Sequence, residues 1–217
     1  MTGSLQAQVI NAGIGGNTTV DLLERVEVDV LSQNPDLVIL MAGTNDMLNS
    51  KKMISFKSYQ ENLGALISTI RGGGAEVLLM SPPPVDSAYL FMRHDRALFE
   101  QVPNAKLDTV KTIVESLQHQ EGIYFLDLND RFKALNLPNH NKDLFIKNAW
   151  NSGKQDGVHP TALGYHFIAA NVFQFLKDHQ LLDQYDKIIC FGDSITYGGG
   201  LESSYPAVLQ ELLNHPE

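Results

Sequence analysis

The chain has 217 residues, of which 43% are hydrophobic and 19% are charged, a composition that can bury a sizeable core and argues against disorder. Its 25 acidic residues outnumber its 16 basic residues and give a net charge of −9, which argues against a surface for nucleic acid or anionic lipid. The single cysteine, Cys190, excludes an internal disulfide framework and a metal site built from several cysteines.

The sequence shows no pattern typical of a targeting segment, a membrane span or a domain boundary. Residues 1–8 carry no charge, and no run reaches the roughly 18–20 apolar residues that a membrane span requires. No low-complexity linker and no internal repeat divides the sequence. We therefore expect one domain over residues 1–217, a cytoplasmic location, no stable membrane association and no nucleic-acid partner.

Five short apolar runs predict the strands of a sheet. They span residues 8–11, 37–41, 76–80, 123–127 and 187–191, and most are continuously apolar, as in strands covered on both faces. Apolar residues at helical spacing predict helices over residues 18–32, 56–71, 106–119 and 161–179. The alternation of strand and helix predicts parallel strands joined by right-handed crossovers, and hence a three-layer α/β/α sandwich.

The residues after each strand matter most for function, because ligands of open parallel sheets bind beyond the carboxyl ends of the strands. Ser194 follows the last apolar run, within Gly192-Asp193-Ser194. A serine on a strand-to-helix turn can expose its hydroxyl at this edge as a nucleophile for acyl transfer. The alternative is a serine that caps a helix, which is the commoner role of an isolated Gly-Asp-Ser.

His159 is the candidate base for this nucleophile. Asp156 precedes it by three residues in a tight turn, so the carboxylate can hold one ring nitrogen protonated while the other accepts a proton. The alternative is a capping aspartate beside an incidental surface histidine. The other six histidines lack such a neighbour and are interpreted as surface or core residues: His94, His119, His140, His166, His179 and His215. No metal-binding spacing occurs, and we expect neither a metal nor a cofactor.

A glycine-rich loop follows the first apolar run. It resembles the start of a dinucleotide fingerprint, but Thr18 stands where the third glycine is required, which disfavours a flavodoxin-like nucleotide binder. The N–H of Gly16 can instead face a developing negative charge, and the side-chain amide of Asn45 can serve as another donor. The alternatives are a tight turn at Gly16 and an Asx-turn at Asn45.

Taken together, these four segments resemble the four blocks of the SGNH hydrolases, also called GDSL esterases/lipases. The resemblance covers nearly the whole chain. It implies that Ser194 is the nucleophile, that His159 is the base and that Asp156 orients His159. It also implies an oxyanion hole formed by the backbone N–H groups of Ser194 and Gly16 and by the side-chain amide of Asn45. Members of the family hydrolyse esters and thioesters without a cofactor.

The order of the blocks departs from the family. The serine block comes first in the family, whereas here it comes last, after Gly16, Asn45 and the Asp156/His159 block. Reading Glu217 straight on into Met1 restores the family order, so we interpret the chain as a circular permutant. This interpretation predicts a flavodoxin-like five-stranded parallel sheet in which the last strand lies between the first and second. A short connection over residues 181–186 could also favour a segment-swapped dimer over a monomer.

The favoured function is hydrolysis of a small or short-acyl ester, of the acetyl type, on an alcohol that could be a sugar. The alternatives are a lysophospholipase or acyl thioesterase of the same family, and a binding module without turnover on the same fold. We expect the pocket walls to come from residues 82–99 and 137–155. A sugar could contact Asn139, His140, Asn141 and Trp150, and an acyl chain could contact Tyr89, Leu90, Phe91 and Met92.

Overall fold

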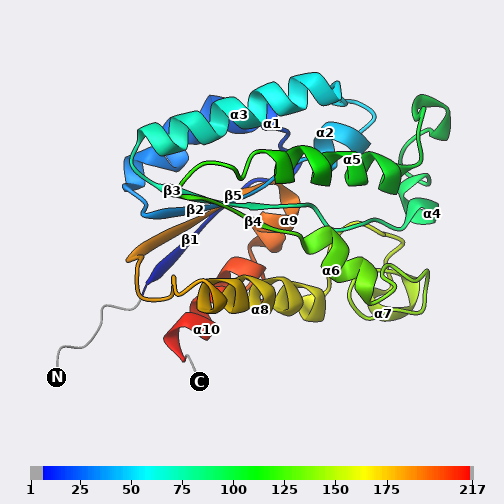
Figure 1. Ribbon diagram of the computed structural model, residues 1–217. Helices are drawn as coiled ribbons and strands as arrows, with labels where there is room; N and C mark the ends of the chain where they lie inside the picture. The colour runs from blue at the N-terminus through cyan, green and yellow to red at the C-terminus, as the bar shows by residue number, and fades with distance from the viewer. Residues whose placement is uncertain (1–6, 216–217) are drawn as a thin grey trace.

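A parallel sheet of five strands forms the middle layer of residues 7–215, the part of the chain that this computed structural model describes. The strand order is β1-β5-β2-β3-β4, and Figure 1 shows helices on both sides of the sheet. The strands are β1 (Gln8–Gly13), β2 (Leu37–Met41), β3 (Glu76–Met80), β4 (Ile123–Leu126) and β5 (Lys187–Gly192). The expected three-layer α/β/α sandwich is therefore confirmed.

Strand β2 shows why the apolar runs form this sheet. All five of its residues are buried, with β5 on one side and β3 on the other. Because side chains alternate along a strand, Ile39 packs into the core on one face of the sheet, and Val38 and Leu40 pack into the core on the other. A continuously apolar sequence satisfies both faces at once.

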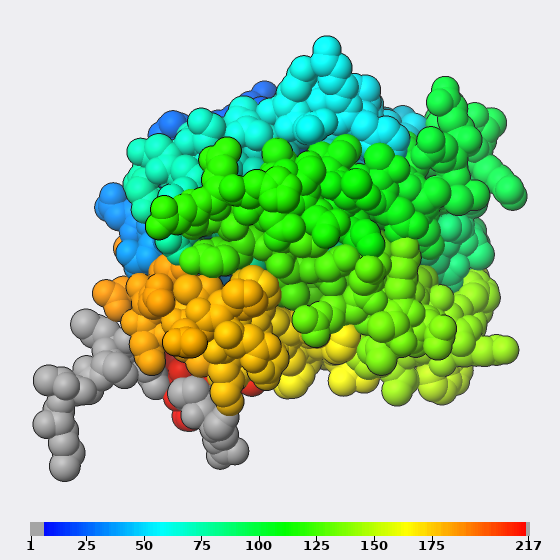
Figure 2. Space-filling view, viewed as in Figure 1, coloured from blue at the N-terminus to red at the C-terminus, as the bar shows by residue number. Residues whose placement is uncertain are grey.

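Helices cover each face of the sheet (Figure 1). One face carries α1 (Thr19–Asp29), α3 (Phe56–Gly72) and α5 (Pro103–Ser116), and the other carries α6 (Leu128–Ala134), α8 (Ala162–Asp178) and α10 (Tyr205–Asn214). In the space-filling view, side chains of α5 and α8 hide the sheet, and the segment that follows α4 projects at the right (Figure 2).

Short helices join the strands to these longer ones. The α-helical turns are α2 (Thr44–Leu48), α4 (Ser87–Leu90), α7 (Ala149–Ser152) and α9 (Ser194–Tyr197). The 3₁₀ turns are η1 (Leu31–Gln33), η2 (Arg96–Leu98) and η3 (Gly198–Gly200). Two of them, α2 and α9, begin at the carboxyl ends of β2 and β5, where the candidate donor Asn45 and nucleophile Ser194 lie.

Several element boundaries differ from those expected. The first strand continues through Asn11 to Gly13, because Ala12 and Gly13 keep their pairing with β5. Helix α5 begins three residues early, at Pro103, a residue whose missing N–H and fixed φ suit the first turn. The fourth strand ends at Leu126, because Asp127 caps α6 by accepting a hydrogen bond from the Asp130 N–H.

The C-terminal strand β5 is central, as expected. It pairs with β1 from Gln8 to Gly13 and with β2 from Leu37 to Met41. The far end of the chain lies beside the beginning of β1: the Gln210 side chain in α10 donates to the Ala7 carbonyl at 2.9 Å and accepts from the Val9 N–H at 2.7 Å. The strand order agrees with the order expected for a circular permutant, but the permutation itself stays a prediction.

Two smaller expectations concern Cys190 and the membrane. Cys190 is fully buried in β5, and burial raises the pKa of its thiol to about 12, as expected for a packing residue. Within residues 7–215, no helix combines the length and the apolar character that crossing a membrane demands.

Candidate active site

Ser194 begins α9, directly after β5 delivers the chain to the carboxyl edge of the sheet. Asp193 caps this helix, because its Oδ1 accepts a hydrogen bond of 2.8 Å from the Ile195 N–H. Gly192 is required by close packing, since a Cβ there would lie 2.3 Å from the Met41 carbonyl oxygen in β2. The serine block is therefore fixed by a cap on one side and by a tight strand contact on the other.

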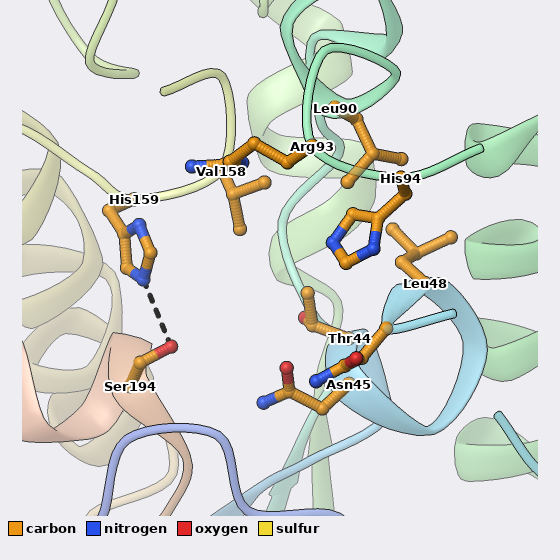
Figure 3. Close-up of a pocket in the computed structure, with 10 residues that line it drawn as sticks. Thr44, Asn45, Leu48, Leu90, Arg93, His94, Val158, His159 and Ser194 are labelled. Carbon is orange, nitrogen blue, oxygen red and sulfur yellow. Dashed lines mark hydrogen bonds between the residues drawn. The ribbon is translucent and has the colours of Figure 1, made fainter. Parts of the chain in front are cut away.

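The turn before α8 brings His159 to Ser194. The His159 Nε2 lies 3.0 Å from the Ser194 Oγ (Figure 3). On the other side of the ring, Nδ1 lies 2.9 Å from one carboxylate oxygen of Asp156 and 3.0 Å from the other. The structure thus brings together the three side chains singled out in the sequence, in a continuous series of contacts from carboxylate to imidazole to hydroxyl. Their catalytic roles stay a prediction.

The same turn holds Asp156 in its charged form. Burial disfavours the carboxylate, but hydrogen bonds from the His159 ring and from the backbone N–H groups of Val158 and His159 outweigh this cost, so the pKa of Asp156 lies below its ordinary value. Gly157 makes the turn possible: its φ is +73°, and a Cβ would lie 2.9 Å from the Asp86 carbonyl oxygen.

The two remaining candidates are Gly16, in the loop after β1, and Asn45, in the first turn of α2. The Asn45 Nδ2 donates to the Asn17 carbonyl at 3.0 Å, which connects α2 to this loop, and it lies 3.4 Å from a carboxylate oxygen of Asp193. Gly16 has a φ of +78°, a conformation suited to glycine. Among the described residues, neither the Gly16 N–H nor the Ser194 N–H has a hydrogen-bond partner, so both remain available to an incoming oxygen.

Two buried carboxylates lie beneath these loops. Burial raises the pKa of Asp193 to about 6 and also raises the pKa of Asp46. Asp46 accepts hydrogen bonds from the N–H and the hydroxyl of Thr19 through one oxygen, while its other oxygen has no partner in the part of the chain that the structure describes. Asp46 thereby ties α1 to α2 directly below the candidate oxyanion donors.

A pocket of about 120 Å³ opens beside Ser194 and His159. Figure 3 shows Ser194 and His159 on one side of it, His94 and Leu48 on the other, and Thr44 and Asn45 below. Of the expected walls, residues 82–99 contribute Leu90, Arg93 and His94, whereas residues 137–155 contribute nothing. The rest of the wall comes from Val158 and from four residues of the segment after β2: Thr44, Asn45, Leu48 and Asn49.

The residues proposed for sugar contact do not line this pocket. Trp150 lies on α7 with 65% of its surface exposed, and the His140 Nδ1 is bonded to Asp86 at 2.6 Å. Of the four residues proposed for acyl contact, Leu90 alone lines the pocket. Tyr89 is buried under this segment, where its hydroxyl donates to the Asn141 side chain at 2.6 Å.

Sequence reasoning missed two arginines that hold the site. Arg25 donates to the carbonyls of Ala12 and Gly192, each at 2.9 Å, and to the Asn17 side chain at 2.7 Å. Arg93 donates to the Asp156 carbonyl at 2.6 Å, so it anchors the turn that carries the candidate base. No motif marks either residue, because their main partners, Gly192 for Arg25 and Asp156 for Arg93, are remote in sequence.

His94 also differs from its expected role as a surface or core residue, since it lines the pocket opposite Ser194 (Figure 3). No sequence pattern identifies His94 as a pocket residue. Its only signal is that it lies in the long segment after β3. Within residues 7–215, no cluster of three histidine, cysteine, aspartate or glutamate residues could hold a metal ion.

Comparison with known proteins assigns the family. The sequence profile of the GDSL-like Lipase/Acylhydrolase family matches residues 2–167. The chain belongs to this family. The matched segment contains Gly16, Asn45, Asp156 and His159 but ends before Ser194, as the unusual block order requires.

Relatives with esterase names cover different shares of the chain. The acetylxylan esterase of Geobacillus stearothermophilus is 28% identical over 177 residues, which are 78% of this chain and 71% of that protein. An arylesterase of Vibrio mimicus is 36% identical over 90 residues, 40% of this chain and 44% of that protein. The uncharacterized lipoprotein YqeF of Bacillus subtilis is 34% identical over 107 residues, 45% of this chain and 44% of YqeF, so the match spans less than half of its length.

Solved structures share the fold. The lipase/acylhydrolase from Enterococcus faecalis has 25% sequence identity and a TM-score of 0.58, covering 76% of this chain and 72% of that one. An acetyl xylan esterase, AlAXEase, has 25% identity and a TM-score of 0.58, covering 76% of this chain and 79% of that one. The family and the names of these relatives support a carboxylic ester hydrolase.

Proposed function

We propose that the chain is a serine ester hydrolase for short-acyl esters, of the acetyl type, in which Ser194 is the nucleophile. The observation that carries the proposal is the relay from Asp156 through His159 to Ser194, with contacts of 2.9 Å and 3.0 Å. This arrangement is the one that acyl transfer to a hydroxyl requires, because the base must reach the nucleophile while a third group fixes its tautomer.

The mechanism follows from the positions of these atoms. His159 Nε2 takes the hydroxyl proton as the Ser194 Oγ attacks the ester carbonyl, and the carbonyl oxygen becomes an oxyanion. The N–H groups of Ser194 and Gly16 and the amide of Asn45 donate to this oxygen. His159 then gives its proton to the departing alcohol, which leaves an acyl-serine. Water, activated in turn by His159, hydrolyses the acyl-serine and restores the enzyme.

Pocket size supports a small ester as the substrate. The pocket of about 120 Å³ is well below the roughly 300–1,000 Å³ of pockets for drug-sized ligands. Acetyl xylan esterases among the relatives agree with an acetyl substrate. A lysophospholipase or a long-chain thioesterase of the same family would need more apolar volume than this pocket offers.

The test is the hydrolysis of p-nitrophenyl acetate by the wild type and by Ser194→Ala. The variant should lose a factor of about a thousand or more in kcat, because it lacks the atom that forms the acyl-enzyme. Ser32→Ala, an exposed serine before β2, is the matched control and should keep the wild-type rate. Equal rates for the wild type and Ser194→Ala would reject the proposal and leave a binding module without turnover as the better account.

A further inference from the structure

His94 lines the end of the pocket opposite Ser194 and takes no part in the contacts among Asp156, His159 and Ser194. His94 is half-buried, and Figure 3 shows its ring pointing into the pocket, between Leu48 and Leu90 and across from Ser194. The next residue back along the chain, Arg93, is held by the Asp156 carbonyl. The His94 ring is therefore placed by the same segment that anchors the catalytic turn.

Hydrogen bonding favours one of the two neutral forms of His94. The Ser50 hydroxyl lies 2.9 Å from Nδ1 and can pair with either form, and the Ser50 backbone N–H makes a longer contact of 3.4 Å with the same nitrogen. Because a backbone N–H can only donate, this second contact favours Nδ1 as the acceptor and places the proton of the neutral ring on Nε2. Nε2–H has no partner among the described residues, so a donor faces the pocket.

The surroundings keep this ring neutral. Burial, followed by the positive charges of Arg93 and Lys51, lowers the pKa of His94 below its ordinary value. A neutral Nε2–H suits a neutral acceptor such as a hydroxyl oxygen, whereas a charged imidazolium would favour an anion. The donor is also present at all pH values, because Nε2 carries a proton in both forms of the ring.

The proposed mechanism places the alcohol portion of the ester on the side of the pocket nearest His159, because the leaving oxygen receives its proton from the His159 Nε2. From there the pocket continues past Val158 toward Leu90 and His94 (Figure 3). The carbonyl oxygen would then face the proposed donor Asn45. A hydroxyl on the alcohol portion, a few bonds from the ester oxygen, would be the first acceptor to reach His94.

We propose that His94 determines specificity, because its Nε2–H donates to a free hydroxyl on the alcohol portion of the substrate. This inference rests on the proposed function and narrows its substrate class to short-acyl esters of polyhydroxy alcohols. An ester without that hydroxyl leaves the donor unpaired when the substrate displaces water from the pocket, which lowers its transition-state binding.

The test compares two esters with the same carbon skeleton, glycerol 1-monoacetate and propyl acetate, by proton release. In the wild type, kcat/KM should favour the glycerol ester. In His94→Phe, which keeps a ring of similar shape but removes the donor, the ratio of the two kcat/KM values should fall about tenfold. His94→Gln, which places an amide N–H near the Nε2 position, should recover part of the ratio. His119→Phe is the matched control at the opposite edge of the sheet and should keep the ratio.

Each remaining outcome counts against the inference. A ratio unchanged in His94→Phe, while hydrolysis still depends on Ser194, would overturn the role of His94 and leave the proposed function intact. A fall seen instead with ethyl lactate against ethyl propanoate, which differ by a hydroxyl on the acyl portion, would overturn the assignment to the alcohol. Loss of the dependence on Ser194 would reject the proposed function itself.

Discussion

The side-chain amide of Asn45 holds two parts of the fold together and is also the proposed oxyanion donor. One N–H of its Nδ2 donates to the Asn17 carbonyl at 3.0 Å and so holds the glycine loop against α2. The other lies 3.4 Å from the Asp193 carboxylate, a weak contact that an oxyanion can replace at little cost. The residue is therefore oriented before the substrate arrives, which is what makes a donor effective in the transition state.

Replacing Asn45 by alanine should lower kcat by about a hundredfold to a thousandfold and change KM much less. The reason is that the lost hydrogen bond strengthens only as the carbonyl oxygen gains charge. Steady-state kinetics on p-nitrophenyl acetate provide both constants. A variant with normal kcat and a raised KM would show that Asn45 binds the ground state instead.

At the scale of single elements, helix α9 is capped by the side chain of Asp193, and burial disfavours the charged form of this carboxylate. Asp193 is 2% exposed, and its pKa is raised from 3.8 to about 6. Between pH 4 and pH 6 the folded chain retains a proton on this group that the unfolded chain has already released. The free energy of unfolding should therefore fall as pH rises through this window, by about 2 kcal/mol for this one group.

Asp193→Asn keeps a capping side chain and removes this titration. Relative to the wild type, the variant should gain about 2 kcal/mol more in the free energy of unfolding at pH 7.5 than at pH 4.5. Denaturant unfolding at the two pH values measures the difference. The exposed Asp183→Asn is the matched control. If the difference in free energy of unfolding between Asp193→Asn and the wild type were the same at both pH values, the raised pKa of Asp193 would be contradicted.

Two parts of the site that were predictable from sequence follow strand ends. Ser194 and Asn45 could be placed because they follow β5 and β2, and parallel strands bring their carboxyl ends to one edge. The Asp156/His159 turn follows no strand and was recognised from its three-residue spacing before α8. The walls could not be placed in this way. Arg93 and His94 lie in the long segment between β3 and α5, whose path depends on contacts such as Arg93 to the Asp156 carbonyl that leave no periodic trace.

At the scale of the whole molecule, the order of the blocks matters less than their positions. The last strand, β5, enters between β1 and β2 and brings Ser194 to His159, although 35 residues separate them in sequence and the serine block stands last instead of first. The Gln210 side chain bonds to the first residues of β1, so the segments that a circular permutation would join already lie together. Permutation is thus a consistent interpretation of the fold.

A rearranged chain tests that interpretation. It would begin at Gln184, run through Glu217 directly into Met1 and end at Asp183, which opens the exposed turn between α8 and β5. Because this turn lies at the amino edge of the sheet, away from the candidate site, the rearranged chain should fold and should retain esterase activity within about tenfold. An unfolded product, or a folded one without activity, would mean that the present order is required.

The central claim is that Ser194 is an activated nucleophile. The most direct measurement is mass spectrometry of the chain after treatment with a fluorophosphonate, which reacts with serine only when a neighbouring base accepts its proton. We predict a single adduct on the peptide that contains Ser194, and its loss in Ser194→Ala and in His159→Ala. An unlabelled wild-type chain, or an adduct on any other serine, would contradict the account.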